Sequence, residues 1–211
     1  MLTRSLWLML MVLVSASGCA MGSDLEPSET VGAQVEQGAP ESLLETTVAL
    51  HATFNGARHR WCGAVAIERF KLATVKHCLV EGQLPSYSLH GSADVRVVRS
   101  IAVHPTEDYA VLTTHEPLVN VPWVARSVTP HEPVQIVSPY YGFAYYTGEV
   151  ESAVGNVVHL SSPGRKGDSG SPVYNADDQL VGILTHCDGD DDRCDPAGGS
   201  LMLKLADRDR R

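Results

Sequence analysis

Gly167-Asp168-Ser169-Gly170-Ser171-Pro172 is the stretch of this 211-residue sequence that says most about its fold and chemistry. Glycines on both sides of a serine permit a tight turn that exposes the hydroxyl and points backbone amides into one space. A serine hydroxyl is a weak nucleophile unless a base lies within hydrogen-bond reach and a third group orients that base. The stretch therefore predicts a histidine and a carboxylate elsewhere in the chain.

A histidine and an aspartate with suitable neighbours precede this serine. His77 stands in Ala73-Thr74-Val75-Lys76-His77-Cys78, and a second cysteine lies upstream in Trp61-Cys62-Gly63-Ala64. Asp108 leads directly into the apolar run Tyr109-Ala110-Val111-Leu112. A carboxylate at the start of a buried strand can lie beside an imidazole and orient it. The order along the chain is histidine, aspartate, serine.

Short strand-like segments follow one another from about Thr30 onward. They are β-branched or alternating runs separated by Gly, Pro, Asn and Asp, at residues 46–50, 95–98, 134–137, 148–150, 156–160 and 181–184. Residues 172–174 and 179–181, on either side of Asn175-Ala176-Asp177-Asp178, are predicted to form a hairpin. Since no segment has a long helical period, the pattern predicts an all-β barrel or sandwich.

The three motifs resemble those of the trypsin/chymotrypsin-like serine proteases, which are Thr-Ala-Ala-His-Cys, Asp-Ile-Ala-Leu and Gly-Asp-Ser-Gly-Gly-Pro in the same order. The resemblance covers about residues 30–205, and Ser171 makes the last motif more similar to the bacterial glutamyl-endopeptidase branch. It implies two antiparallel six-stranded β-barrels with the active site in the cleft between them. We expect the first barrel over residues 30–118 and the second over residues 119–211.

The resemblance also implies a role for each residue. Ser169 is the nucleophile, His77 the general base and then the general acid, and Asp108 the group that orients the imidazole. The amides of Gly167 and Ser169 form the oxyanion hole. The expected protein is a serine endopeptidase that acts on proteins or peptides through an acyl-enzyme, with no cofactor and no metal. Two alternatives stay open: a catalytically inactive protease-fold binding lipoprotein, and esterase-like hydrolysis by the same triad.

The specificity pocket departs from the trypsin-like pattern. Pro163 stands six positions before the serine, where trypsin-like members carry the aspartate that binds Lys or Arg. The family's Ser-Trp-Gly wall aligns with Thr185-His186-Cys187, which predicts a narrower pocket. His186, and Arg165 and Lys166 directly before the serine motif, favour an acidic side chain in the substrate. We therefore predict a preference for small or acidic residues rather than Lys or Arg.

Asp168 requires a partner if it is buried, because an unpaired buried carboxylate is unstable. In trypsin-like members the corresponding aspartate pairs with an N-terminal amine freed by cleavage. Thr30-Val31-Gly32-Ala33 resembles such a start, although Glu29 precedes it and offers no tryptic site. Many bacterial relatives use an internal cation instead, and we expect one here; the N-terminal alternative stays open.

Five cysteines leave one without a partner. The resemblance implies a Cys62–Cys78 disulfide, which leaves Cys187 to pair with Cys194. Zinc is not expected at these cysteines, because their spacing lacks the usual Cys-x2–4-Cys pairs. The acidic run from Asp188 to Asp195 offers oxygen ligands for calcium, but we expect it to be a solvated loop.

The fifth cysteine belongs to the N-terminal segment. Residues 1–18 combine Arg4 with a short apolar run from Leu6 to Val14, which is typical of an export signal and too short to cross a bilayer. Ala16-Ser17-Gly18-Cys19 resembles the bacterial lipoprotein signal, so we expect lipidation at Cys19, an outer-membrane location and a disordered acidic tether over residues 19–29. Ordinary cleavage near Cys19 also fits, and the protein would then be periplasmic or extracellular.

Composition narrows the partners. The formal net charge is −9, and charged residues make up 19% of the chain. This acidic balance argues against nucleic acid, whose phosphates require a basic surface. The apolar fraction of 44% permits a real core and excludes wholesale disorder. Apart from substrate and a lipid anchor we expect no partner, and the protein is predicted to be a monomer.

Overall fold

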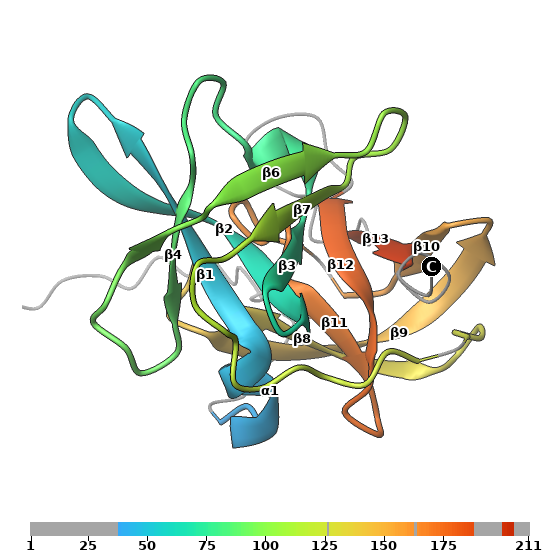
Figure 1. The fold of residues 1–211 in the computed structure, drawn as a ribbon. Helices are drawn as coiled ribbons and strands as arrows, with labels where there is room; N and C mark the ends of the chain where they lie inside the picture. Colours follow the sequence, from blue (N-terminus) through green and yellow to red (C-terminus); the bar gives the residue numbers. More distant parts are fainter. Residues whose placement is uncertain (1–37, 126, 163, 188–199, 205–211) are drawn as a thin grey trace, which may run out of the picture. The chain divides into compact units, whose positions relative to one another are not determined.

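The computed structural model describes residues 38–125, 127–162, 164–187 and 200–204, all of which belong to one compact unit spanning Val31–Arg211. They form the short helix α1 (Glu41–Thr46), the 3-10 turn η1 (Lys76–Cys78) and strands β1 to β13 (Figure 1). The strands make two antiparallel sheets. Within the described ranges, no helix has both the length and the apolar character that a membrane crossing requires.

The first sheet has the strand order β5-β4-β1-β2-β3-β7-β6. The strands are β1 (Thr47–Phe54), β2 (Ala57–Glu68), β3 (Lys71–Thr74), β4 (Ser86–Leu89), β5 (Arg96–Val97), β6 (Ser100–Val103) and β7 (Ala110–Thr113). Its edge strands β5 and β6 are consecutive in the chain, separated by Val98 and Arg99 alone. The Val98 amide donates to the carbonyl oxygen of Pro85 at 3.1 Å, and the Arg99 amide donates to that of Thr113 at 2.7 Å. Residues 96–103 are therefore one bent strand that pairs with both ends of a curled sheet.

The second sheet is a closed barrel with the strand order β10-β13-β12-β11-β8-β9. The strands are β8 (Pro133–Ser138), β9 (Ala144–Val154), β10 (Val157–Leu160), β11 (Pro172–Asn175), β12 (Leu180–Cys187) and β13 (Ser200–Lys204). The predicted hairpin is confirmed, because β11 and β12 pair antiparallel. Asn175 Oδ1 closes its turn by accepting hydrogen bonds from the amides of Asp177 (3.1 Å) and Gln179 (2.9 Å).

Both predicted barrels are present as curled antiparallel sheets. The six strands expected in the second are found. The first has seven named strands because its bent strand is divided in two at residues 98–99. The break follows from the sharp turn of the chain from one sheet edge to the other.

The larger hydrophobic core joins the two sheets. Tyr174, Leu180 and Ile183 of the second barrel pack in the same buried cluster as Val65 and Leu72 of the first sheet. The buried Tyr174 hydroxyl also hydrogen-bonds the Thr46 hydroxyl of α1 at 2.6 Å. Because apolar burial is the main stabilising contribution to folding, this shared core fixes the position of one sheet on the other.

Candidate active site

His77 and Asp108 meet because the strands beside them pair. Strand β3 runs antiparallel to β7, with Thr74 opposite Ala110, so η1 after β3 lies beside the residues before β7. The His77 Nδ1 atom lies 2.7 Å from Asp108 Oδ2, and the backbone amide of His77 donates to Asp108 Oδ1 at 3.0 Å. Two contacts from one carboxylate fix the orientation of the imidazole, which leaves Nε2 as the nitrogen free to take a proton.

A disulfide holds the histidine turn against the first sheet. Cys62 of β2 is bonded to Cys78 of η1, with Cα atoms 6.1 Å apart. This is the pairing that the family resemblance implied. The second implied pair lies outside the described residues at Cys194, and Cys187 is described only by its place in β12. Cys19, the expected lipidation site, and Pro163, expected in the specificity pocket, also lie outside them.

Ser169 lies in the loop between β10 and β11, and that loop is attached to the first sheet. The Gly63 amide of β2 donates to the Ser169 carbonyl oxygen at 2.8 Å. Gly170 has a φ of 79°, and a Cβ there would overlap the Gly63 carbonyl oxygen and lie 2.6 Å from Thr74 Oγ1. Only glycine fits this contact, which brings the serine beside the strands that carry His77.

The Ser169 hydroxyl donates to the carbonyl oxygen of Thr185 in β12, at the long distance of 3.4 Å. Among the described contacts, no hydrogen bond joins Ser169 Oγ to His77. Catalytic hydrogen bonds are often long or misaligned in proteins without substrate.

Backbone amides beside the serine are free to bind an anion. Gly167 has a φ of 94°, and a Cβ there would lie 2.6 Å from Cδ1 of the Tyr140 ring. The neighbouring Tyr141 hydroxyl donates to the Lys166 carbonyl oxygen at 2.8 Å, which braces this turn. Within the described part of the chain, neither the Gly167 amide nor the Ser169 amide donates to a protein acceptor. An oxyanion hole requires such uncommitted donors.

Asp168, next to the serine, is 2% exposed and has neutral donors around it. The hydroxyls of Ser138 and Tyr146 donate to Oδ1, the latter at 3.0 Å, and the Arg165 amide donates to Oδ2 at 2.8 Å. Burial raises the pKa of Asp168, and these hydrogen bonds and the positive charge of Arg165 oppose the rise. We expected an internal cation, and Arg165 is one whose charge favours the ionised carboxylate, although among the described residues no ion pair joins the two. The Arg165 guanidinium stacks over the Tyr146 ring, 5.2 Å from its centroid.

The predicted pocket wall contributes an unexpected neighbour to His77. Thr185 is buried, whereas His186 is exposed, and its ring centroid lies 5.1 Å from that of His77. Sequence reasoning placed His186 in the predicted pocket but not against His77. It also missed Ser138, Tyr140 and Tyr146, which brace the serine loop from β8, β9 and their connection. No local motif marks these residues, since their contacts depend on how the second barrel closes.

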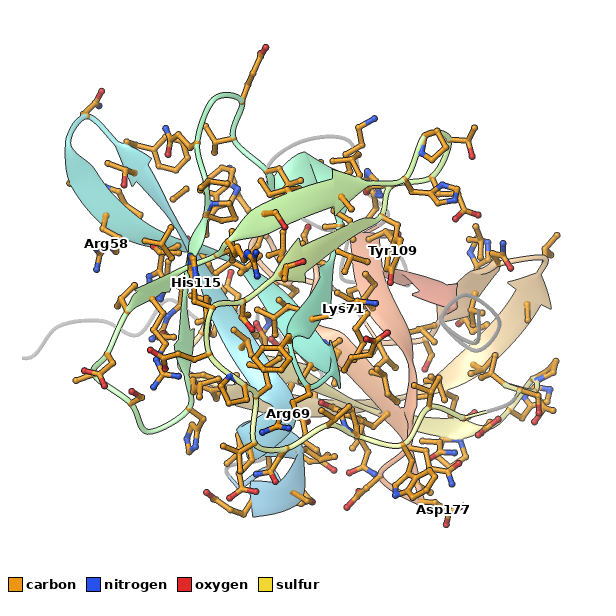
Figure 2. The ribbon with its side chains drawn as sticks, viewed as in Figure 1. Arg58, Arg69, Lys71, Tyr109, His115 and Asp177 are labelled. Carbon is orange, nitrogen blue, oxygen red and sulfur yellow. A yellow bond between two sulfur atoms is a disulfide. The ribbon has the colours of Figure 1, made fainter. Side chains whose placement is uncertain are left out.

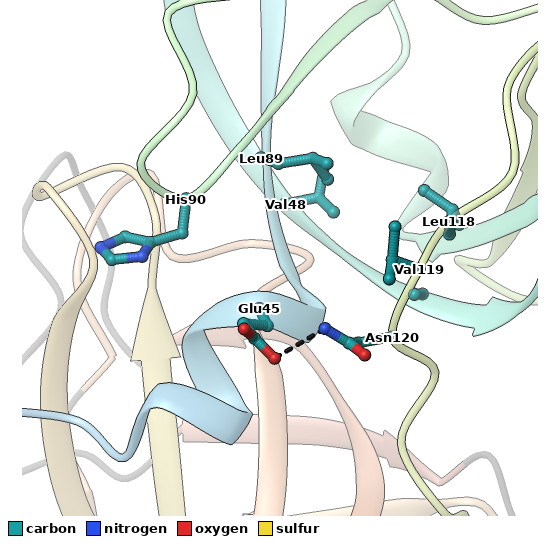
Figure 3. A pocket seen from close by; sticks show the side chains of 8 residues that line it. Glu45, Val48, Leu89, His90, Leu118, Val119 and Asn120 are labelled. Atoms are coloured by element: carbon teal, nitrogen blue, oxygen red, sulfur yellow. Dashed lines mark hydrogen bonds between the residues drawn. The ribbon is translucent and has the colours of Figure 1, made fainter.

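Another cavity, of about 250 Å³, lies on the first sheet beside α1 (Figure 3). It is lined by Glu45, Val48, Ala66, Leu89, His90, Leu118, Val119 and Asn120. The Glu45 carboxylate accepts a hydrogen bond from Asn120 Nδ2 at 2.6 Å. No serine, threonine or cysteine lines this cavity, so it offers no hydroxyl or thiol nucleophile.

Comparisons with known proteins agree with the fold. No family model matches the chain, and no curated protein matches it in sequence. Among solved structures, neuropsin, a serine protease expressed in the limbic system of mouse brain, superposes with a TM-score of 0.63 and 18% identity over 80% of this chain and 92% of its own. The apo MamO protease domain of Magnetospirillum magneticum gives a TM-score of 0.61 and 17% identity over 77% of this chain and 93% of its own. The chain therefore has the chymotrypsin-like fold.

Proposed function

We propose that this protein is a serine endopeptidase with Ser169 as nucleophile, His77 as general base and Asp108 as the orienting carboxylate. The observation that carries the proposal is the 2.7 Å contact between His77 Nδ1 and Asp108 Oδ2. It lies beside a serine loop that the Gly63 amide ties to the same sheet. The protease fold of the structural relatives supports the reaction class, but only at the level of fold.

The reaction begins when Ser169 Oγ attacks the carbonyl carbon of the scissile peptide bond and His77 Nε2 takes the hydroxyl proton. The amides of Gly167 and Ser169 stabilise the oxyanion, a contribution of about 3 kcal/mol for each donor. His77 then protonates the leaving amine, which gives the acyl-enzyme. Water attacks the ester in a second cycle, with His77 again taking and returning a proton. Asp108 keeps Nδ1 protonated throughout and stabilises the imidazolium.

We further propose a preference for small or acidic side chains, as in the glutamyl-endopeptidase branch, and no preference for Lys or Arg. The exposed His186 ring lies 5.1 Å from that of His77, centroid to centroid, and among the predicted wall residues it is the described side chain that can carry a charge. Cleavage of peptide libraries that vary the residue before the scissile bond tests this. Dominant cleavage after Lys or Arg contradicts it.

Labelling with a fluorophosphonate tests the proposed activity. Such a reagent traps a serine only when a base has activated it and an oxyanion hole is formed. We expect labelling of the wild-type chain and none of Ser169→Ala. Absence of labelling in correctly processed wild type would instead support a catalytically inactive binding protein. Turnover of esters without turnover of peptides would support the esterase alternative.

We also propose that the protein is exported, lipidated at Cys19 and monomeric. Incorporation of labelled palmitate that Cys19→Ser abolishes is the expected result, and a mature chain that lacks palmitate contradicts it. N-terminal sequencing of active enzyme tests activation. A start at Thr30 means that cleavage generates the active form, whereas a start at Cys19 means that no further cleavage is needed.

A further inference from the structure

His77, Asp108 and His186 form a cluster whose potential ligand atoms all lie within 4.8 Å of one another. The sequence predicts no metal site, since its cysteine spacing lacks zinc-binding pairs, and this cluster contains no cysteine. The cluster arises from two sheets: His77 follows β3 of the first and His186 lies in β12 of the second. No sequence spacing could have joined them.

The free nitrogens of the two histidines are available to a ligand. Asp108 occupies His77 Nδ1, so Nε2 is the nitrogen left over. Among the described residues, no hydrogen bond engages His77 Nε2 or either ring nitrogen of His186. Both side chains are exposed. Two neighbouring imidazoles with unengaged nitrogens are the preferred ligands of Zn²⁺ and related divalent ions.

We propose that His77 Nε2 and His186 bind a divalent transition-metal ion, Zn²⁺ above all, and that this ion reversibly blocks the active site. Tetrahedral zinc with Zn–N bonds of about 2.0 Å requires ligand nitrogens about 3.3 Å apart. The potential ligand atoms of the cluster lie within 4.8 Å of one another. Rotation of the exposed His186 ring toward His77 brings the two ligand nitrogens to the shorter distance that zinc requires. Water fills the remaining positions, because two protein ligands leave the coordination sphere open.

Asp108 strengthens the site without touching the ion. A carboxylate bonded to the far nitrogen of a metal-binding histidine fixes the tautomer and raises the basicity of the ligating nitrogen. The contact of 2.7 Å between Asp108 and His77 has this form. With two imidazole ligands rather than three or four, we expect micromolar affinity, which suits reversible control better than permanent occupancy.

A metal ion on His77 prevents the proposed reaction. His77 Nε2 is the atom that must accept the Ser169 proton, and a nitrogen whose lone pair is bound to a metal cannot accept one. Binding of the ion does not depend on the proposed function. Inhibition does rest on it, because it requires a reaction to inhibit.

Calorimetric titration of ZnSO₄ into the full chain carrying Ser169→Ala tests binding independently of any proteolysis. We expect one site of micromolar affinity, weakened at least 10-fold by adding His77→Ala or His186→Ala. Asp108→Asn should weaken Zn²⁺ binding by about 10-fold or more, because the carboxylate that orients His77 through Nδ1 is lost. His115→Ala is the matched control: this exposed histidine lies beyond the end of β7 opposite Tyr109 (Figure 2), and its loss should leave the affinity unchanged.

The same titration can overturn the proposal. An absence of binding, or an affinity that is unchanged in His186→Ala, excludes this site. In wild type, Zn²⁺ should slow fluorophosphonate labelling, a chelator should restore it, and labelling of His186→Ala should be insensitive to Zn²⁺ relative to its own metal-free rate. If wild type binds Zn²⁺ but is never labelled, the metal site stands and the proposed protease activity fails.

Discussion

The backbone amide of Gly63 donates a 2.8 Å hydrogen bond to the carbonyl oxygen of Ser169, so the loop that carries the proposed nucleophile is fastened to strand β2 of the opposite sheet. Gly170 closes the same contact from the other side, since nothing larger than hydrogen fits between it and the Gly63 carbonyl. The position of Ser169 relative to His77 is therefore set by contact between two backbones rather than by side chains.

Gly170→Ala should damage both stability and activity. Its φ of 79° disfavours a side chain, and the new methyl group would overlap β2. We expect a loss of at least about 2 kcal/mol in the free energy of unfolding and loss of fluorophosphonate labelling. Gly155→Ala is the matched control, with a φ of 61° and no atom within 4 Å of the added Cβ. It should cost about 1 kcal/mol and leave labelling intact. Equal effects of the two changes in urea unfolding would contradict the steric argument.

Removing the buried hydroxyl of Ser171 should stabilise the fold, whereas removing that of Ser138 should destabilise it. Ser171 Oγ is buried and has no hydrogen-bond partner among the described residues. The Ser138 hydroxyl is equally buried but donates to Asp168. We expect Ser171→Ala to raise the free energy of unfolding by about 1 kcal/mol and Ser138→Ala to lower it by about 2 kcal/mol. Urea unfolding measures both, and destabilisation by Ser171→Ala would mean that this hydroxyl has a partner.

Asp168 should make the stability of the chain depend on pH. Burial raises its native pKa above its ordinary value of 3.8, so the native state binds more protons than the unfolded chain above that pH. Stability contributed by this group therefore falls as pH rises from the ordinary value through the native pKa, and is level beyond it. Asp168→Asn cannot ionise, so its profile should lack this fall. Urea unfolding of both chains from pH 4 to 8 gives the difference. A wild-type advantage that grows with pH would mean that the charge of Arg165 and the hydrogen-bond donors outweigh the effect of burial on Asp168.

Asp108→Asn should retain the fold and lose most of the activity. The uncharged amide cannot stabilise the imidazolium, and with its oxygen on the His77 backbone amide it presents an NH2 donor to Nδ1, which favours the tautomer with the proton on Nε2. We expect the rate of hydrolysis to fall by about 10⁴-fold with little change in the melting temperature, because the Asp108 side chain is 28% exposed. The fluorophosphonate labelling rate and thermal unfolding check the two halves of the prediction. A minor effect on labelling would remove Asp108 from the mechanism.

The sequence could predict the role of residues whose structural requirement is set by their immediate neighbours in the chain. The glycines of the serine motif, the turn at Asn175 and the aspartate before an apolar strand each combine a backbone requirement with neighbours in the chain. Strand β2 was missed because residues 62–67 are all buried, which hides the alternation expected of a half-exposed strand. Helix α1 was missed because its six residues are too few to show a helical period. The partners of Asp168 lie 22 and 30 residues away and depend on barrel closure.

The bent strand at residues 96–103 also bears on how this protein avoids aggregation. An open sheet edge is a template for strands of other molecules, and natural proteins keep such edges short. Here the free sides of the first sheet belong to β5 and β6, of two and four residues. The kink at Val98 and Arg99 makes strands β5 and β6 run in different directions. Straightening it would join them into one longer exposed edge, so the kink limits pairing between copies of the chain.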